Sequence, residues 1–351
     1  MAVIELKGLK KHFHAVKAVD GVDLQINEGE LLVILGPSGC GKTTLMRMIA
    51  GLEKPTAGEI EIAGERVTDL PPRRRKLAMV FQSYALYPHM TVFNNIAFPL
   101  KAQGHLKKDE IRRKVEDAAT LLGVQHLLER KPRQLSGGER QRVALCRAMV
   151  KEPRVLLLDE PLSNLDAKLR TIARDELQRF QRQLGITTIF VTHDQIEAMG
   201  MGDRIVVMSA GKVRQVGAPK EVYHESADTF VATFLGSPGM NLIDWEDFIV
   251  GFRPEQFIPK EAAGATNPLQ PFPFHIHRVE YLGADQLLYG EIAETAADVI
   301  TVARLPAALD IPITANRSYD FGVLPQHLRF FDKESGLRIA PRPLGKEPHH
   351  G

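Results

Sequence analysis

The sequence of 351 residues is poor in cysteine and contains no long apolar run. Its two cysteines, Cys40 and Cys146, are too few for a disulfide framework, and we interpret both as small residues of a reduced compartment. No apolar run approaches the roughly 18 residues that cross a bilayer, and residues 1–7 lack the basic and then apolar order of a signal peptide. We therefore expect a cytoplasmic chain that reaches a membrane only through a partner.

The chain also has little net charge, with a formal value of +2 at pH 7. This balance gives no electrostatic case for nucleic acid, so we predict no nucleic-acid partner. A hydrophobic share of 44% and a charged share of 25% are typical of a globular protein and disfavour extended disorder. The length allows one large domain and one smaller domain.

Four short apolar runs indicate strands that are buried on both faces: residues 31–35, 77–81, 155–158 and 188–191. Helical stretches separate them, which predicts a parallel α/β sheet. Ligands of such sheets bind beyond the carboxyl ends of the strands. Gly36, Gln82, Asp159 and His193 each follow one of these runs, so we expect them at one edge of the sheet.

The rest of the chain divides by pattern. Between residues 88 and 150 the pattern is helical, with apolar residues at three- and four-residue spacing from Ile111 to Leu122 and Gly123 placed as a C-cap. After residue 236, short alternating segments (272–276, 287–292 and 299–302) punctuated by proline and glycine favour a small β-barrel. We predict a sheet domain over 1–236 with a helical subdomain at about 88–150, a β-rich domain over 237–340 and a tail over 341–351.

Residues 36–43 match the pattern G-x-x-x-x-G-K-[ST] and follow a predicted strand. Backbone N–H groups of such a loop, at the start of a helix, bind phosphate oxygens. We expect Lys42 to reach the β- and γ-phosphates and Thr43 to bind Mg²⁺. Cys40 lies near the helix N-terminus, so we expect a lowered thiol pKa and loss of nucleotide binding on alkylation. The predicted nucleotide contacts are Gly36, Pro37, Ser38, Gly39, Cys40, Gly41, Lys42, Thr43 and Thr44.

Two carboxylates close the third apolar run. Asp159 ends an apolar strand, where a carboxylate is costly unless it meets a cation, so we predict Mg²⁺ there, bound directly or through water. Glu160 faces another direction and is the candidate that positions or deprotonates the attacking water; a helix-start acid is the alternative. We favour a γ-phosphate contact for His193 over a structural role. Gln82 carries an amide that can touch metal or water and release it cheaply, which suits a switch.

Residues 135–139, Leu-Ser-Gly-Gly-Glu, form the most informative segment. Ser136 and Glu139 have the spacing of a capping box that opens a helix. A cap does not require two glycines, however. Gly137 and Gly138 expose backbone N–H groups at a helix N-terminus, and this predicts a second anion site.

Together these motifs resemble those of the ATP-binding subunits of ABC transporters, in order and over roughly residues 3–240. Residues 36–43 match the Walker A motif of that family, 155–159 its Walker B motif and 135–139 its signature motif. Gln82 falls on the Q-loop, residues 163–166 on the D-loop, and His193 on the H-loop. The resemblance implies an α/β P-loop NTPase fold and an ATPase with ATP and Mg²⁺ as cofactors. Phe13 falls where the family stacks an aromatic ring on adenine, although by itself it is more typical of a core residue.

The resemblance also implies partners. In this family two such domains form a dimer in which the signature segment of one subunit closes on the γ-phosphate held by the other. We therefore expect a homodimer in which Ser136, Gly137, Gly138 and Asp166 serve the nucleotide. Residues 83–90 fall on the surface that receives the permease, which suggests contacts from Tyr84, Leu86 and His89; internal packing is the alternative. The implied complex contains two integral membrane permease subunits and, through them, an extracytoplasmic solute-binding protein, with this chain peripheral on the inner face of the membrane.

The C-terminal part indicates a branch of the family. Residues 250–255 and 324–328 resemble paired strand motifs of the C-terminal, oligonucleotide-binding-like (TOBE-like) domain of importer subunits, which is regulatory or dimer-forming. Residues 234–241 are most similar to subunits of sugar importers of the maltose or glycerol-phosphate type, so we expect a carbohydrate importer. Iron(III), polyamine and sulfate importers remain alternatives, because the ATPase chain does not touch the cargo.

Two other classes fit less well. A soluble, non-transport ABC ATPase acting on ribosomes or DNA usually carries two ATPase domains or a long coiled-coil insertion, and neither is evident. A P-loop kinase or GTPase would not need the signature segment, and no guanine-reading Asn-Lys-x-Asp stands out in the sequence.

Overall fold

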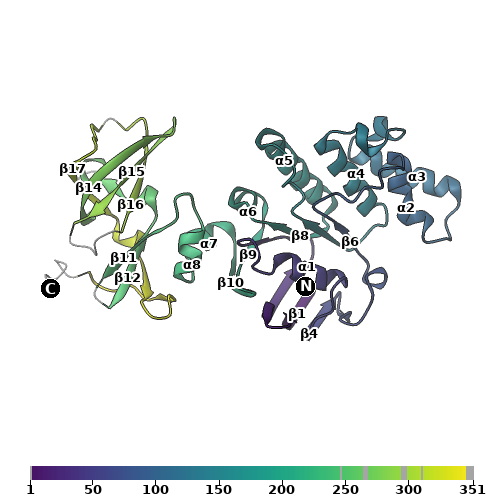
Figure 1. Cartoon of the computed structure of the whole chain (residues 1–351), viewed down its shortest axis with the longest axis horizontal. Helices are drawn as coiled ribbons and strands as arrows, with labels where there is room; N and C mark the ends of the chain where they lie inside the picture. Colours follow the sequence, from purple (N-terminus) through teal and green to yellow (C-terminus); the bar gives the residue numbers. More distant parts are fainter. Residues whose placement is uncertain (1, 246, 264–267, 294–298, 310, 345–351) are drawn as a thin grey trace. The chain divides into compact units, whose positions relative to one another are not determined.

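A computed structural model describes residues 2–245, 247–263, 268–293, 299–309 and 311–344 (Figure 1). The chain divides into two units, Met1–Pro219 and Lys220–Gly351. Residues 345–351, most of the predicted tail, lie outside the described residues.

The first unit is organised around a six-stranded sheet of order β10-β9-β3-β8-β7-β6. The neighbouring strands from β9 to β6 pair in parallel, and β10 is antiparallel to β9. Every residue of β3, β7 and β8 is buried, which confirms the interpretation of three of the four apolar runs. In β6, at the end of the sheet, only Val80 is buried and the other three residues are partly buried, so burial on both faces was wrong for the run 77–81. The strands are β3 (Leu31–Leu35), β6 (Leu77–Val80), β7 (Val155–Asp159), β8 (Thr187–Thr192), β9 (Arg204–Ser209) and β10 (Lys212–Gly217).

A second, antiparallel sheet of order β2-β1-β4-β5, which was not predicted from the sequence, packs in the same unit. Its strands are β1 (Ala2–Phe13), β2 (Val16–Asn27), β4 (Ala57–Ile62) and β5 (Glu65–Arg66). The helix α1 (Lys42–Ala50) shares one hydrophobic core with both sheets. Figure 1 shows α1 and α5 (Ala167–Leu184) on opposite sides of the six-stranded sheet, and α6 (Gln195–Met201) beside β9.

The helices expected between residues 88 and 150 are α2 (Val92–Lys101), α3 (Lys108–Leu121) and α4 (Gly137–Met149), with 3₁₀ turns at Gln125–Leu127 and Pro132–Gln134. A further 3₁₀ turn, Pro72–Arg74, precedes β6. The three helices share a core that includes Ile96, Val115, Val143 and Cys146. Gly123 follows α3 in the left-handed region, as expected for the end of a helix.

The described residues of the second unit form two short helices and two antiparallel sheets, of order β11-β12-β18-β19 and β13-β17-β14-β15-β16. They enclose a phenylalanine-rich core that includes Phe252, Phe257 and Phe274, which fits the small β-barrel predicted from the sequence. The helices are α7 (Pro219–His224) and α8 (Thr229–Phe234). The strands are β11 (Asn241–Trp245), β12 (Phe248–Phe252), β13 (Ile258–Pro259), β14 (Gln270–Tyr281), β15 (Asp285–Ile292), β16 (Thr301–Pro306), β17 (Arg317–Val323), β18 (Arg329–Asp332) and β19 (Arg338–Ile339).

The two motifs at residues 250–255 and 324–328 occupy equivalent places in this unit. The strand β12 is followed by the 3₁₀ turn Pro254–Gln256, and β17 is followed by the 3₁₀ turn Pro325–His327. In each case a proline, whose fixed φ suits the first position, begins the turn. A third 3₁₀ turn, Lys260–Ala262, follows β13.

The division between the units lies after Pro219, whereas the sequence predicts a boundary after residue 236. The difference arises from Arg253, next to the end of β12. Its buried guanidinium donates hydrogen bonds to the carbonyl oxygens of Tyr223, Ala232 and Leu235. These bonds bind α7 and α8 to the β-sheets, so residues 220–236 belong to the second unit.

Candidate functional site

The phosphate loop connects the end of β3 to α1, as the motif predicts. Gly41 has a φ of 108°, and a Cβ atom there would collide with the carbonyl oxygen of Ala18. Gly36 is equally restricted by the carbonyl oxygen of Met208. Only glycine fits both positions. The loop is closed by Lys42, whose Nζ donates to the carbonyl oxygens of Gly36 at 2.7 Å and Pro37 at 2.9 Å.

A cavity of about 470 Å³ lies at this loop. Of the predicted nucleotide contacts it is lined by Ser38, Gly39, Gly41, Lys42, Thr43 and Thr44, and Glu160 joins them from the end of β7. Its remaining lining residues, which the sequence analysis missed, are Val16, Lys17, Ala18, Ala210 and Gly211. They come from β2 and the β9–β10 turn and carry no motif, so only the fold brings them to the site.

Phe13, the expected adenine-stacking residue, does not line this cavity. It ends β1 with 42% of its surface exposed, and the ammonium group of Lys11 lies 4.8 Å from its ring centroid. This exposure contradicts the alternative that Phe13 is a core residue. An exposed ring near the first residues of β2 remains available for stacking.

Thr43 and Asp159 meet beside the loop. The Thr43 hydroxyl donates to Asp159 Oδ1 at 3.2 Å, and burial raises the pKa of the Asp159 carboxyl. In the described part of the chain no three His, Cys, Asp or Glu side chains gather to hold a metal by themselves. One carboxylate and one hydroxyl nevertheless fit Mg²⁺, which prefers oxygen ligands and takes the others from phosphate and water. Gln82, the third predicted ligand, makes its contacts with other residues.

The three predicted catalytic side chains converge on one carboxylate. Glu160 Oε2 accepts a hydrogen bond from Gln82 Nε2 at 3.3 Å, and His193 Nδ1 lies 3.3 Å from the same oxygen. Glu160 has a φ of 44°, a left-handed conformation that is rare for residues other than glycine. Its backbone N–H donates to the carbonyl oxygen of Val191 at 3.1 Å, which fixes the turn after β7. The edge of the sheet therefore holds Gln82, Glu160 and His193 as one group.

The signature segment forms the expected capping box at the start of α4. Ser136 Oγ accepts from the backbone N–H of Glu139 at 3.3 Å, and Glu139 Oε2 accepts from that of Ser136 at 2.7 Å. This bonding to Ser136 lowers the pKa of Glu139. A Cβ atom at Gly137 would lie 2.8 Å from the side chain of Leu165, so glycine permits close approach to the D-loop.

Ser136, Gly137, Gly138 and Asp166 do not line the cavity at the phosphate loop of their own chain. Asp166 caps α5 and accepts a hydrogen bond from the backbone N–H of Leu169 at 3.0 Å. The predicted nucleotide contacts other than Phe13 thus form two groups, one at the phosphate loop and one at the starts of α4 and α5.

The expected reactivity of Cys40 is wrong. This residue is only 4% exposed, and burial raises the pKa of its thiol. Desolvation of the thiolate outweighs the favourable charge of Lys42 and the helix N-terminus. Cys146 is buried among the helices, which raises its pKa to about 12.

The predicted permease contacts differ in accessibility. His89 is exposed and Leu86 is partly buried against the helical core, but Tyr84 is only 5% exposed. The Tyr84 side chain is therefore part of the interior of this unit rather than of its surface. Tyr87 and Phe98, which are not among the predicted contacts, pack nearby in a tilted arrangement with ring centroids 4.7 Å apart.

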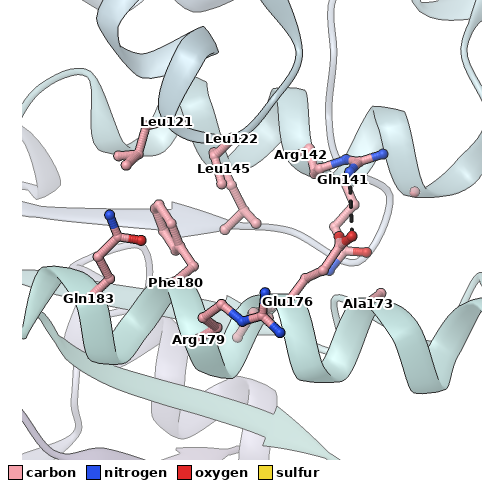
Figure 2. Close-up of a pocket in the computed structure, with 12 residues that line it drawn as sticks. Leu121, Leu122, Gln141, Arg142, Leu145, Ala173, Glu176, Arg179, Phe180 and Gln183 are labelled. Carbon is pink, nitrogen blue, oxygen red and sulfur yellow. Dashed lines mark hydrogen bonds and ion pairs between the residues drawn. The ribbon is translucent and has the colours of Figure 1, made fainter.

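A groove of about 190 Å³ separates α4 from α5 (Figure 2). Its apolar lining includes Leu122, Leu145 and Phe180. At one end Arg142 on α4 reaches towards Glu176 on α5, with Nη1 and Oε1 3.5 Å apart. A half-exposed ion pair thus connects α4, the helix that follows the signature segment, to α5 beside the six-stranded sheet.

Comparison with known proteins decides the family. A family model described as "ABC transporter" matches residues 19–163. The sn-glycerol-3-phosphate import ATP-binding protein UgpC of Yersinia pseudotuberculosis is 46% identical, over 97% of this chain and 100% of its own length. UgpC of Cereibacter sphaeroides is 46% identical over the same shares. The chain belongs to the ATP-binding proteins of ABC transporters.

Solved structures agree with this assignment. The ATP-binding cassette MJ0796, in a dimeric post-hydrolysis state with ADP and Pi, is 32% identical with a TM-score of 0.55, over 62% of this chain and 98% of its own. The protein cbiO1 of Clostridium perfringens, part of an ABC transporter complex, is 32% identical with a TM-score of 0.58, over 63% of this chain and 90% of its own. The predicted ABC ATPase fold is confirmed.

The chain is an ATP-hydrolysing subunit of an ABC importer, as the resemblance implied. Such an import subunit works with membrane permeases. In the part of the chain that the structure describes, no helix has the length and apolarity needed to span a membrane.

Proposed function

We propose that two copies of this chain form a homodimer in which each ATP–Mg²⁺ site is built from the phosphate loop of one copy and the signature segment of the other. The observation that carries this proposal is the separation of Ser136, Gly137 and Gly138 from the cavity that Lys42 and Thr43 line. Backbone N–H groups at the start of α4 have no triphosphate to bind within their own chain, and a second copy supplies one. The dimeric arrangement of MJ0796 supports the same conclusion.

Each residue at the sheet edge has a chemical role in this proposal. Lys42 and the backbone N–H groups of the loop would hold the β- and γ-phosphates, and Thr43 and Asp159 would hold Mg²⁺, which would supply positive charge against the phosphates. Glu160 accepts the proton of the attacking water. Gln82 and His193, both at 3.3 Å from Glu160 Oε2, orient that carboxylate and contact the γ-phosphate side of the site.

We propose a carbohydrate as the cargo, with glycerol 3-phosphate first, because relatives named for its import match this chain over nearly its whole length. Iron(III), polyamine and sulfate importers are the second choice, since cargo does not reach the ATPase. The complex contains two permease subunits and an extracytoplasmic solute-binding protein, and this chain lies on the cytoplasmic side of the membrane. Stimulation of ATP hydrolysis in the reconstituted complex by glycerol 3-phosphate, and not by sulfate or spermidine, tests the cargo.

The dimer is tested with Glu160→Gln, which slows hydrolysis by about 10²-fold or more and so retains ATP. We expect this variant to elute as a dimer with ATP and Mg²⁺ and as a monomer without them. Glu160→Gln combined with Ser136→Arg is the matched control and stays monomeric. A Glu160→Gln variant that hydrolyses ATP at the parent rate would contradict the role of Glu160.

A further inference from the structure

Arg147, near the end of α4, reaches the segment that follows Gln82. Its Nη1 donates to the carbonyl oxygen of Ala85 at 2.7 Å, and its Nη2 donates to that of Tyr84 at 2.8 Å. The guanidinium also lies 5.8 Å from the ring centroid of Tyr87. Burial lowers the pKa of Arg147, yet an arginine remains charged at neutral pH. The planar fork of one side chain therefore holds two successive carbonyl groups.

The backbone that Arg147 holds is strained. Tyr84 and Ala85 have φ values of 60° and 48°, in the left-handed region that residues with a Cβ atom rarely adopt. Such conformations persist where surrounding contacts impose them. The Tyr84 hydroxyl does not impose this conformation, because it is buried without a hydrogen-bond partner among the described residues. The two hydrogen bonds from Arg147 are made directly to the carbonyl oxygens of Tyr84 and Ala85.

The segment 82–87 is attached to three different elements. Asn164, in the D-loop, donates to the carbonyl oxygen of Gln82 at 2.7 Å. Asn95, on α2, accepts from the backbone N–H of Tyr87 at 2.8 Å. Arg147 attaches the middle of the segment to α4. A shift of α4 would therefore move the middle of the segment, while Asn164 and Asn95 hold its two ends.

The same helix carries the signature segment at its other end. Helix α4 begins at Gly137, next to Ser136, and at about 1.5 Å per residue Arg147 lies some 15 Å further along its axis. A helix of this length moves as one body, whereas Gln82 is joined to Glu160 by a single contact of 3.3 Å. A displacement of the signature end would therefore reach the backbone beside Gln82 through the two hydrogen bonds of Arg147.

We propose that Arg147 is a positioning residue for ATP hydrolysis: it links α4 to residues 82–87 and so makes the contact between Gln82 and Glu160 depend on where α4 lies. The proposal rests on the roles of Gln82 and Glu160 given above. Binding of a triphosphate at the start of α4 then sets the catalytic carboxylate through Arg147, so that hydrolysis follows closure of the dimer.

The first test compares Arg147→Met with Arg142→Met in the full chain. Arg142 lies on the same helix and makes a half-exposed ion pair with Glu176, away from residues 82–87, so it controls for loss of an α4 arginine. We expect kcat to fall about tenfold in Arg147→Met through loss of two charge-assisted hydrogen bonds. The Kd for a fluorescent ATP analogue should stay within about twofold, since the phosphate loop is untouched. Arg142→Met should keep the parent kcat.

A second variant separates positioning from a general structural role. Glycine adopts the left-handed conformation without strain but does not restore the link to α4, so Ala85→Gly in the Arg147→Met background should leave kcat about as low as in Arg147→Met alone. Arg147→Lys, combined with Ala85→Gly, makes the same test if Arg147→Met does not fold. A kcat within twofold of the parent in Arg147→Met, or recovery of the parent kcat by Ala85→Gly, would overturn the proposal. If Glu160→Gln hydrolyses ATP at the parent rate, the role assigned to Glu160 is wrong. This result does not depend on how the Arg147 variants behave.

Discussion

Replacement of Arg253 by methionine should strongly destabilise the second unit. The guanidinium is 1% exposed and donates to the carbonyl oxygens of Tyr223, Ala232 and Leu235 and to the Ser226 hydroxyl. Methionine fills similar volume but donates nothing, so buried carbonyl groups lose their partner at about 1–3 kcal/mol each. Ala232 keeps one bond, from the backbone N–H of Met240 at 3.1 Å. Tyr223 keeps a longer bond, from the Ser226 hydroxyl at 3.4 Å. Loss of the bond at Leu235 and weaker bonding at the other two carbonyls therefore lower the free energy of unfolding by about 3 kcal/mol.

The assay uses Trp245, the single tryptophan of the chain, which is buried in β11 and reports on this unit alone. With a urea dependence of about 2 kcal/mol per molar, the fluorescence midpoint should fall by about 1.5 M. Arg342→Met is the control, because Arg342 forms an exposed pair with Asp247 at 3.0 Å and should change stability by less than about 1 kcal/mol. A midpoint for Arg253→Met within about 0.5 M of the parent would refute the role assigned to these hydrogen bonds.

Two further predictions follow from buried groups in the first unit. Burial raises the pKa of the Cys40 and Cys146 thiols, so N-ethylmaleimide should label both about tenfold more slowly in the folded chain than in urea; equal rates at Cys40 would contradict this. Burial also raises the pKa of Glu197 above 4.5 despite its hydrogen bond from Thr192. The protonated Glu197 carboxyl therefore contributes most to stability at low pH, and this contribution is lost as the pH rises through the folded-state pKa. Glutamine does not titrate, so the Glu197→Gln variant does not lose stability in this way. Between about pH 4 and 7 the stability difference measured by circular dichroism should shift in favour of Glu197→Gln, and a difference independent of pH would oppose the account.

The sheet edge was predictable because its signals are local. The apolar runs end where the strands end, and parallel strands bring their carboxyl ends together, so Gln82, Asp159, Glu160 and His193 meet as expected. The capping box of Ser136 and Glu139 is equally local, because its two partners are three residues apart.

The features that the sequence did not reveal depend on contacts between distant residues. The sheet of β1, β2 and β4 alternates buried and charged positions without a motif, so Val16 and Lys17 at the cavity were missed. The pKa of Cys40 is set by desolvation in the folded loop, which no neighbour in the sequence discloses. The division after Pro219 depends on Arg253, which lies 30 residues from Tyr223.

The shared nucleotide site is tested most directly by mixing two inactive chains. Lys42→Ala removes the phosphate-loop side of a site and Ser136→Arg removes the signature side, so each variant alone should be inactive. Random pairing of equal amounts makes about half of the dimers heterodimers, and each heterodimer has one intact site of two. The mixture should therefore recover about a quarter of the parent rate of ATP hydrolysis. A mixture no more active than its components would contradict the account, as would a Ser136→Arg chain that hydrolyses ATP at the parent rate.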